Sequence, residues 1–144
     1  MDSLNVRWMK RDDLKSVMRM QKISGEFSKN HTQEFINKNN AICSVVEVEG
    51  NVVGFIFYEI DASSLEIDSL IVDPAFRRRG IGTELLSKLI AKLNKKRREI
   101  LFKVSEYDLP SHLLLKKCGF KATEVIKNSA TSDYLFSFSA PIKK

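Results

Sequence analysis

The sequence predicts an α/β fold, a mixed sheet with helices on both faces, and three observations support it. Alternating apolar strands crowd the first half of the chain around a tight turn. In the second half, two helical patterns each follow directly on a strand. The expected order of elements is β α α β β β α β α β β. Because the sequence has no repeat, low-complexity tract or linker, residues 1–144 should form a single domain.

The elements of the first half follow from hydrophobic periodicity. A short strand at residues 5–10 precedes an amphipathic helix at 12–23, which either of two aspartates can cap. The polar stretch that follows contains a short helix, for which Thr32 supplies the cap. Residues 41–60 are typical of two strands joined by a Glu-Gly-Asn turn. Residues 64–72 alternate as a further strand, which a proline ends.

The second half adds strands and helices in alternation. A strong apolar face over residues 82–97 predicts an amphipathic helix. A strand at 99–106 is followed by a second helix at 110–120, with proline near its start and glycine past its last turn. Residues 121–128 and 132–139 are typical of two further strands. The second half therefore contributes a strand–helix–strand unit to the sheet.

The charge is divided unevenly between the two halves. The whole chain has a formal net charge of +6, with 24 Lys and Arg against 18 Asp and Glu. Residues 1–70 contain 8 basic and 11 acidic side chains, whereas residues 71–144 contain 16 basic and 7 acidic ones. A basic half indicates an anionic partner such as a phosphate, although a solvated lysine-rich surface explains the same composition.

Several classes of protein are disfavoured by simple patterns. Apolar residues make up 43% of the chain, but no apolar run approaches the ~18 residues that span a membrane. The N-terminus lacks an apolar signal-peptide core, so we expect a cytoplasmic protein with free thiols at Cys43 and Cys118. His31 and His112 are also isolated in the sequence. These spacings predict no metal site.

The stretch DPAFRRRGIGTELL, residues 73–86, combines bare backbone, positive charge and the start of a helix. The first N–H groups of a helix have no intrahelical acceptor and bind anions, phosphate above all. Two glycines let an anion approach the backbone, and three arginines add charge. A P-loop would need a following Lys-Ser or Lys-Thr pair, and a dinucleotide fingerprint would need glycine at Leu85. Of the three phosphate-binding patterns considered, only Arg-x-x-Gly-x-Gly after a strand fits this stretch.

With LIVDPAFRRRGIGTELL and, one strand later, LLLKKCGF, the chain resembles the GCN5-related N-acetyltransferase (GNAT) superfamily. The resemblance implies that the loop binds the pyrophosphate of coenzyme A. It also implies that the preceding strand, through Leu70, Ile71 and Val72, lies beside the pantetheine arm and the thioester. The loop residues implied as cofactor-binding are Arg77, Arg78, Arg79, Gly80, Ile81, Gly82 and Thr83.

In size and layout, the chain is similar to enzymes that acetylate protein N-termini, such as the ribosomal-protein alanine acetyltransferases. Their R-x-x-N segment places an asparagine where this chain has Asp108, which the resemblance makes a cofactor-binding residue. Their tyrosine, the proton donor to the thiolate, corresponds to Leu115 here. Lys103 occupies a strand position that carries a base in some relatives.

Three residues are candidates for acid–base chemistry. Glu66 lies fourteen residues before Gly80, which is where similar histone acetyltransferases carry their glutamate base. Asp68 follows two residues later and should lie on the same face of the strand. Two carboxylates this close raise one pKa towards the useful range. Tyr107 is a weaker candidate for the thiolate acid, and all three side chains are also compatible with a plain solvated surface.

These observations predict an acetyl-CoA-dependent N-acetyltransferase in which an amine attacks the thioester directly. The expected partners are acetyl-CoA and an amine acceptor, with a protein N-terminus ahead of a small molecule, in a monomer or homodimer. A silent coenzyme A-binding module is an alternative, and we expect neither nucleic acid nor membrane as a partner. Acidic residues of the first half should attract a cationic acceptor, namely Glu26, Glu34, Glu59, Glu66 and Asp68.

Overall fold

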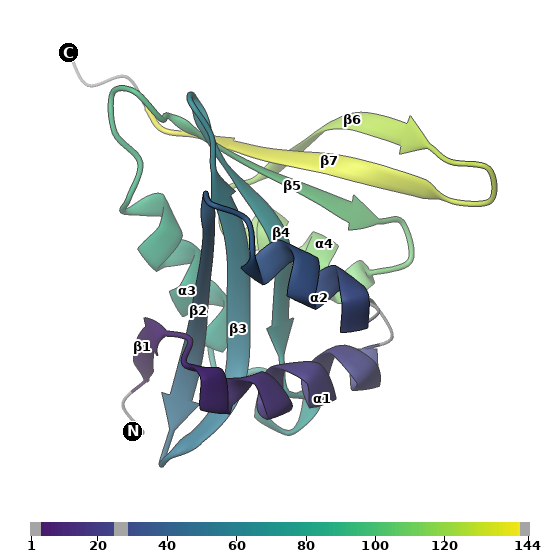
Figure 1. Cartoon of the computed structure of the whole chain (residues 1–144). Helices are drawn as coiled ribbons and strands as arrows, with labels where there is room; N and C mark the ends of the chain where they lie inside the picture. Colours follow the sequence, from purple (N-terminus) through teal and green to yellow (C-terminus); the bar gives the residue numbers. More distant parts are fainter. Residues whose placement is uncertain (1–3, 25–28, 142–144) are drawn as a thin grey trace.

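The computed structural model describes residues 4–24 and 29–141. It has a seven-stranded mixed sheet with two helices on each face (Figure 1). The strands are β1 (Asn5–Trp8), β2 (Ala41–Val48), β3 (Asn51–Ile60), β4 (Ser64–Val72), β5 (Glu99–Ser105), β6 (Lys121–Lys127) and β7 (Ser132–Ser139). The helices are α1 (Leu14–Ser24), α2 (Lys29–Ile36), α3 (Ile81–Ile90) and α4 (Leu109–Lys117), with 3₁₀ turns at Arg11–Asp13 and Pro74–Phe76. The predicted fold class and element order are confirmed.

The strands lie in the order β1-β2-β3-β4-β5-β7-β6. Neighbouring strands are antiparallel except β4 and β5, which run parallel. Helices α3 and α4 pack on one face, where Leu85, Leu86 and Leu115 join the larger core cluster. Helices α1 and α2 cover the other face, where Val17 and Phe35 pack against β2 and β3. The molecule is therefore a three-layer sandwich with a core on each side of the sheet.

The hairpin between β2 and β3 forms at the predicted turn. Glu49 and Gly50 both have positive φ, at 50° and 83°. Two consecutive left-handed residues define the type I′ turn, whose twist matches that of the flanking strands. This prediction is confirmed.

The predicted helix at 82–97 is shorter in the structure, because α3 ends at Ile90. The side-chain oxygen of Asn94 accepts hydrogen bonds from the backbone N–H groups of Lys96 and Arg97, each at 2.9 Å. This local turn competes with helical hydrogen bonding and stops the helix, as asparagine often does. Leu93 lies beyond the end of the helix but still packs against the core, and this is why the apolar pattern of the sequence extends past Ile90.

Thr32 does not cap α2, so that prediction is wrong. The helix begins at Lys29, and Thr32 lies inside it with no exposed surface. Its hydroxyl donates a 2.6 Å hydrogen bond to Oε1 of Gln21 on α1. Thr32 therefore ties the two helices of this face together at a buried contact.

The entry into α1 depends on Asp13, one of the two aspartates expected there. Its buried carboxylate accepts hydrogen bonds from both terminal nitrogens of Arg7 and from the backbone N–H of Lys10. The hydrogen bonds from Arg7 are the main reason that the pKa of Asp13 is lowered. This ion pair anchors β1 to the start of α1.

Candidate active site

The site is built where β4 and β5 separate. The two parallel strands pair only over Ser64–Ile67 and Glu99–Phe102. Beyond this point β4 continues to Val72 and β5 to Ser105 without a ladder between them. The backbone groups of β4 that face β5 over residues 68–72 are therefore not used by the sheet, and they line an opening between the strands.

A β-bulge lies at the same place. In the β3–β4 pairing, Phe57 opposes Ser69 and Tyr58 opposes Ile67, so Asp68 is the extra residue. A bulge bends its strand and re-aims the side chain at the irregular position. Asp68 is thus the first residue of β4 beyond the paired segment, and it faces the opening.

A groove of about 720 Å³ runs from this opening along the loop that precedes α3. It brings together ten of the eleven residues predicted to bind the cofactor, and Arg79 is not among its lining residues. The opposite wall comes from the first turns of α4, including Leu109, Ser111 and Leu114. The predicted residues in the groove are Leu70, Ile71, Val72, Arg77, Arg78, Gly80, Ile81, Gly82 and Thr83, joined by Asp108.

The start of α3 has the geometry of an anion site. Gly80 is the N-cap, with φ of +78°, and a Cβ there would meet nothing within 4 Å. The first helical hydrogen bond runs from the N–H of Glu84 to the carbonyl of Gly80, at 2.9 Å. The N–H groups of Ile81, Gly82 and Thr83 precede it and have no intrahelical acceptor. They lie at the positive end of the helix dipole and border the groove.

The sequence indicated that Gly82 lets an anion approach the backbone, but the structure gives another reason for its missing side chain. A Cβ at this position would lie 2.7 Å from Cδ2 of Leu114. The glycine therefore lets α3 approach α4, and its contact is a leucine of the opposite wall. The bare backbone that is open to a ligand is at Gly80.

The three arginines of the loop also divide by position. Arg77 and Arg78 line the groove, and Arg78 has a left-handed φ of 66°. The guanidinium of Arg79 instead lies over the ring of Phe76, 4.9 Å from its centroid. Two of the three predicted charges therefore face the groove.

A second pocket of about 540 Å³ lies on the α2 side of the opening. Five carboxylates line it, together with two lysines and one histidine. They come from α2, the α2–β2 loop, β3, β4, β5, the β5–α4 loop and β7. These charged residues are His31, Lys38, Glu59, Glu66, Asp68, Lys103, Asp108 and Asp133.

Asp108 lines both the groove and the second pocket, so it marks their junction. It is the N-cap of α4, where its carboxylate accepts from the backbone N–H of Ser111 at 3.2 Å and from its hydroxyl at 2.7 Å. Whatever binds in the groove can therefore reach an acidic pocket at one end. The arrangement suits transfer of a group from an anionic donor to a cationic acceptor.

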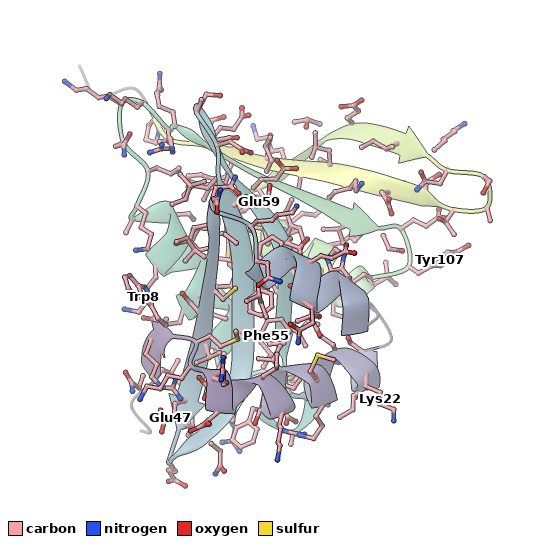
Figure 2. The ribbon with its side chains drawn as sticks, viewed as in Figure 1. Trp8, Lys22, Glu47, Phe55, Glu59 and Tyr107 are labelled. Carbon is pink, nitrogen blue, oxygen red and sulfur yellow. The ribbon has the colours of Figure 1, made fainter. Side chains whose placement is uncertain are left out.

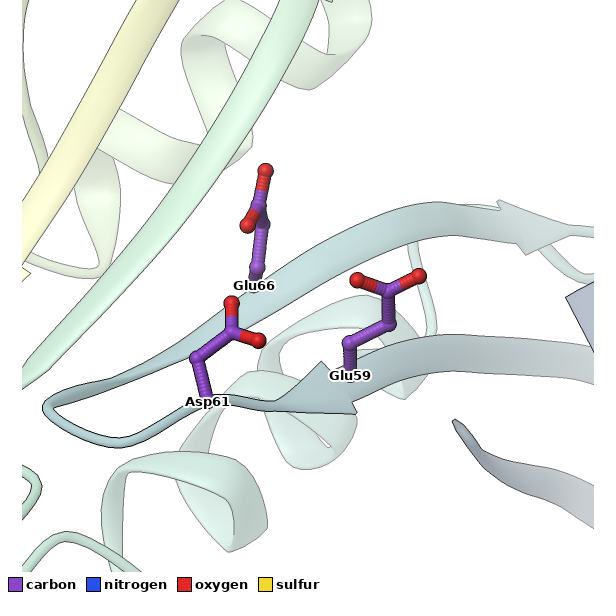
Figure 3. A group of neighbouring side chains, drawn as sticks. All are labelled: Glu59, Asp61 and Glu66. Atoms are coloured by element: carbon purple, nitrogen blue, oxygen red, sulfur yellow. The ribbon is translucent and has the colours of Figure 1, made fainter. Parts of the chain in front are cut away.

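The predicted base Glu66 lies in the second pocket at the closed end of the opening. One oxygen of its carboxylate and one each from Glu59 and Asp61 lie within 4.8 Å of one another, and the three side chains are neighbours (Figure 3). Partial burial is the first cause that raises the pKa of Glu66, followed by Asp61 and Glu59, whereas Lys103 lowers it. The sequence indicated the Glu66–Asp68 pair but not this triad, because β3 and β4 meet only through the fold.

Asp68 shares the pocket with Glu66, as predicted, but its direct partner was not foreseen. Nε2 of His31 lies 3.1 Å from both carboxylate oxygens of Asp68. The two residues are 37 positions apart and come from α2 and β4. No local spacing signals this pair, so sequence reasoning treated His31 as isolated.

The expected proton donors on the α4 side are not in the site. Tyr107 is 73% exposed, lines neither pocket, and projects from the β5–α4 loop (Figure 2). Leu115, which replaces the tyrosine of similar enzymes, is fully buried in the core, and its neighbour Leu114 faces the groove. Tyr107 remains a prediction that its position does not support.

The acidic residues expected to meet the acceptor are partly rearranged. Glu59, Glu66 and Asp68 line the second pocket, whereas Glu34 does not. Glu26 lies outside the described residues. Asp108 and Asp133 add two carboxylates from the basic half of the chain.

Comparison with known proteins decides the family of this site. Residues 9–120 match the model of the acetyltransferase (GNAT) family. The chain belongs to this family. Over 91 residues it is 36% identical to an uncharacterized N-acetyltransferase of Methanocaldococcus jannaschii, which covers 58% of this chain. The match spans only 40% of that relative's length.

Solved structures share the GNAT fold at low identity. The ribosomal-protein-S18-alanine N-acetyltransferase of Escherichia coli superposes with a TM-score of 0.84 and 15% identity, over 99% of this chain and 97% of its own. Arabidopsis thaliana NAA60 in complex with a bisubstrate analogue gives 0.81 and 15%, over 96% and 98%. NAA60 has also been solved with acetyl-CoA, and this complex matches with a TM-score of 0.78 and 16% identity, over 95% and 99%. Among the described residues of this chain, no helix is long and apolar enough to cross a membrane.

Proposed function

We propose that this chain is an acetyl-CoA-dependent N-acetyltransferase that acetylates a primary amine by direct attack. The observation that carries the proposal is the junction at Asp108, where a groove with an anion site meets a pocket lined by carboxylates. Membership of the GNAT family and the likeness to folds that bind acetyl-CoA support it. The donor and the acceptor enter from different sides and meet beside β4.

The groove fits coenzyme A in both shape and charge. The unpaired N–H groups of the first α3 turn, together with Arg77 and Arg78, suit the pyrophosphate. The free edge of β4 beside Leu70, Ile71 and Val72 suits an extended amide-bearing arm, because it offers strand-type hydrogen bonds. When bound, acetyl-CoA supplies an activated acetyl thioester. A β4 N–H at this edge is then the group that stabilises developing negative charge on the carbonyl oxygen.

The acceptor pocket supplies the groups that handle the amine. Asp68, the first residue past the paired strands, attracts the ammonium form, and Glu66 accepts its proton. The neutral nitrogen then forms a bond to the acetyl carbon while the carbon–sulfur bond breaks. The sulfur leaves as a thiolate, and the second proton that the nitrogen loses passes to this thiolate or to solvent. Glu66 suits this role because its pKa is raised towards the working range.

We further propose a protein N-terminal α-amine as the acceptor. Deprotonation at pH 7 costs about 1.4 kcal/mol for an α-amine and roughly 4.6 kcal/mol for a lysine side chain. A site with a carboxylate base and no tyrosine at position 115 therefore handles α-amines more readily. The fold shared with N-terminal acetyltransferases supports the same choice.

A small polyvalent amine is the second candidate, and the pocket itself favours it. Its volume of about 540 Å³ suits a small molecule, and its five carboxylates exceed what one ammonium group needs. Binding of coenzyme A without any transfer would instead indicate a silent module.

One experiment separates these possibilities. The purified chain is incubated with acetyl-CoA and a panel of peptides with free N-termini, lysine side chains blocked, and small mono- and polyamines. Intact-mass detection of an acetylated product, with matched release of free thiol, identifies the acceptor class. We expect the α-amine peptides to react fastest. Thermal stabilisation by coenzyme A with no product from any amine would contradict the enzyme assignment but not the binding site.

A further inference from the structure

We propose that His31 is a positioning residue for the acceptor amine, acting through Asp68. The Asp68 carboxylate binds the acceptor's ammonium group, and His31 orients that carboxylate and adjusts its effective charge. The inference rests on the proposed function, because it assigns the recognition of the amine within the same site.

The contact between the two side chains is two-pronged. Nε2 of His31 is 3.1 Å from Oδ1 and 3.1 Å from Oδ2 of Asp68. An ionised carboxylate only accepts hydrogen bonds, so Nε2 carries the hydrogen. One N–H directed between both oxygens holds the carboxylate in one orientation. His31 is 40% exposed and Asp68 20%, so the pair is open to the pocket on one side.

The orientation of the Asp68 carboxylate matters because of where Asp68 lies on β4. It is the extra residue of the β-bulge and the first residue past the β4–β5 pairing, so the backbone alone defines its direction less tightly than in a regular strand. Two residues on, Leu70 begins the free edge of β4 that lines the cofactor groove. A contact from α2 therefore fixes a carboxylate that lies two residues before the part of β4 that lines the cofactor groove.

Two of the ionisable groups near the His31–Asp68 pair are held in one charge state by their surroundings. Lys38 forms an ion pair with Glu59, which is the main reason for its raised pKa. Cys43 on β2 also faces Asp68, and burial raises its pKa to about 12, so it stays a neutral thiol. The remaining titratable groups of the pocket are Glu66 on β4, Lys103 on β5, Asp108 in the following loop and Asp133 on β7.

Histidine is the side chain that ordinarily changes charge between pH 5 and 8. When His31 gains a proton, its positive charge lies against Asp68 and opposes a cationic acceptor. When it is neutral, the Nε2 hydrogen bond remains and the carboxylate keeps its full charge. The acceptor should therefore bind more weakly as the pH falls, whereas coenzyme A in its separate groove should not respond.

The pair is tested first without any substrate. The chain has only two histidines, so nitrogen-15 NMR resolves the His31 and His112 rings separately. We expect the His31 ring to carry its hydrogen on Nε2, and its Nε2 signal to shift in Asp68→Asn, because the charged acceptor of that hydrogen is lost. Signals of His112, buried against Tyr134 and Phe136, serve as the internal control. An unchanged Nε2 signal of His31 in Asp68→Asn overturns the proposal.

The second test measures KM of a hexapeptide with a free Ala-Arg N-terminus, at saturating acetyl-CoA, from pH 5.5 to 8. His31→Gln keeps a donor near the Nε2 position but does not titrate. We expect the ratio of wild-type to His31→Gln KM to rise roughly fivefold towards pH 5.5, as for one partly exposed charge contact. His31→Ala should raise KM at every pH. Glu34→Gln, an exposed change on the same helix, should match the wild type.

The outcomes separate the inference from the proposed function. A wild-type protein that acetylates the peptide, with a His31→Gln profile parallel to its own, overturns the role of His31 alone. A wild-type protein that acetylates no amine overturns the proposed function, and the NMR comparison of wild type with Asp68→Asn then still decides whether the pair exists. A His31→Gln change in kcat with unchanged KM would also contradict the proposal, because positioning of the bound amine acts on KM here.

Discussion

The two sides of the site are built in opposite ways. The cofactor side is made mostly of backbone from one continuous segment, residues 70–83, with a wall from α4. The acceptor side is made of side chains from seven separate segments of the chain. In the proposed function, backbone groups recognise the part of acetyl-CoA that never varies, whereas the side chains of the acceptor side can change one at a time. The difference explains why a family can keep its donor while its acceptors vary.

The two sides also differ in charge. The groove presents Arg77, Arg78 and Lys117 beside the positive end of α3, which favours a polyphosphate. The second pocket presents five carboxylates against Lys38, Lys103 and His31, which favours a cation. The uneven charge of the two halves of the sequence reflects this division only in part, because Asp108 and Asp133 belong to the basic half.

The largest effect should follow a charge reversal on the cofactor side. Thr83→Glu places a carboxylate in the first turn of α3, where it favours the helix dipole but repels a pyrophosphate. Two like charges about 4 Å apart near a surface cost about 4 kcal/mol, so coenzyme A affinity should fall roughly a thousandfold. Calorimetry measures the affinity, and Thr83→Gln controls for size. Equal affinity of the two variants would place the pyrophosphate elsewhere.

The second-largest effect should follow removal of the proposed base, Glu66, on the acceptor side. Glu66→Gln should lower kcat/KM at neutral pH by about a hundredfold, within the usual range for a lost general base, while coenzyme A binding stays unchanged. In the wild type, the rate should rise with pH through the raised pKa of Glu66, because only the carboxylate accepts a proton. The variant should lack that rise and recover partly at high pH, where the amine is neutral unaided. Full activity at neutral pH would assign the proton to another group.

A smaller effect should separate acceptors by charge. Peptides with a basic residue next to the N-terminus should show kcat/KM roughly tenfold above those with an acidic one, because the pocket carboxylates attract them. Raising the ionic strength from 0.05 to about 0.3 M should narrow that gap, since the Debye length falls below about 8 Å. Initial rates at two salt concentrations measure both quantities. If basic and acidic peptides react alike at low salt, the carboxylates have no part in choosing the acceptor.

The smallest effect concerns stability rather than rate. The pKa of Glu66 is raised in the folded protein, so its protonated form favours folding at low pH and its ionisation opposes folding as pH rises through that pKa. Glu66→Gln should therefore raise the melting temperature at pH 7.5 by a few degrees at most, on the order of 2 °C, and by less at pH 4. Differential scanning calorimetry at both pH values measures the change. A larger gain at pH 4 would contradict the raised pKa.

Local chemistry explains which predictions succeeded. The I′ hairpin at Glu49 and Gly50 and the strand that Pro74 follows each depend on a few adjacent residues. The helix end at Ile90 was mispredicted because apolar periodicity continued to Leu93 while the Asn94 turn broke the backbone pattern. Gly82 lines the groove from within α3, and the contact with Leu114 replaces the predicted reason for its missing side chain.

By itself, the sequence determined the order of elements and the family, and it predicted the cofactor loop, because these follow from periodicity and from contiguous backbone. The tertiary structure alone decided the acceptor side. It brought His31 to Asp68, gathered Glu59, Asp61 and Glu66, buried Leu115 and turned Tyr107 outward. Such contacts join residues far apart along the chain, and they depend on how helices pack across a sheet whose strands separate. No spacing along one chain encodes that packing in a readable form.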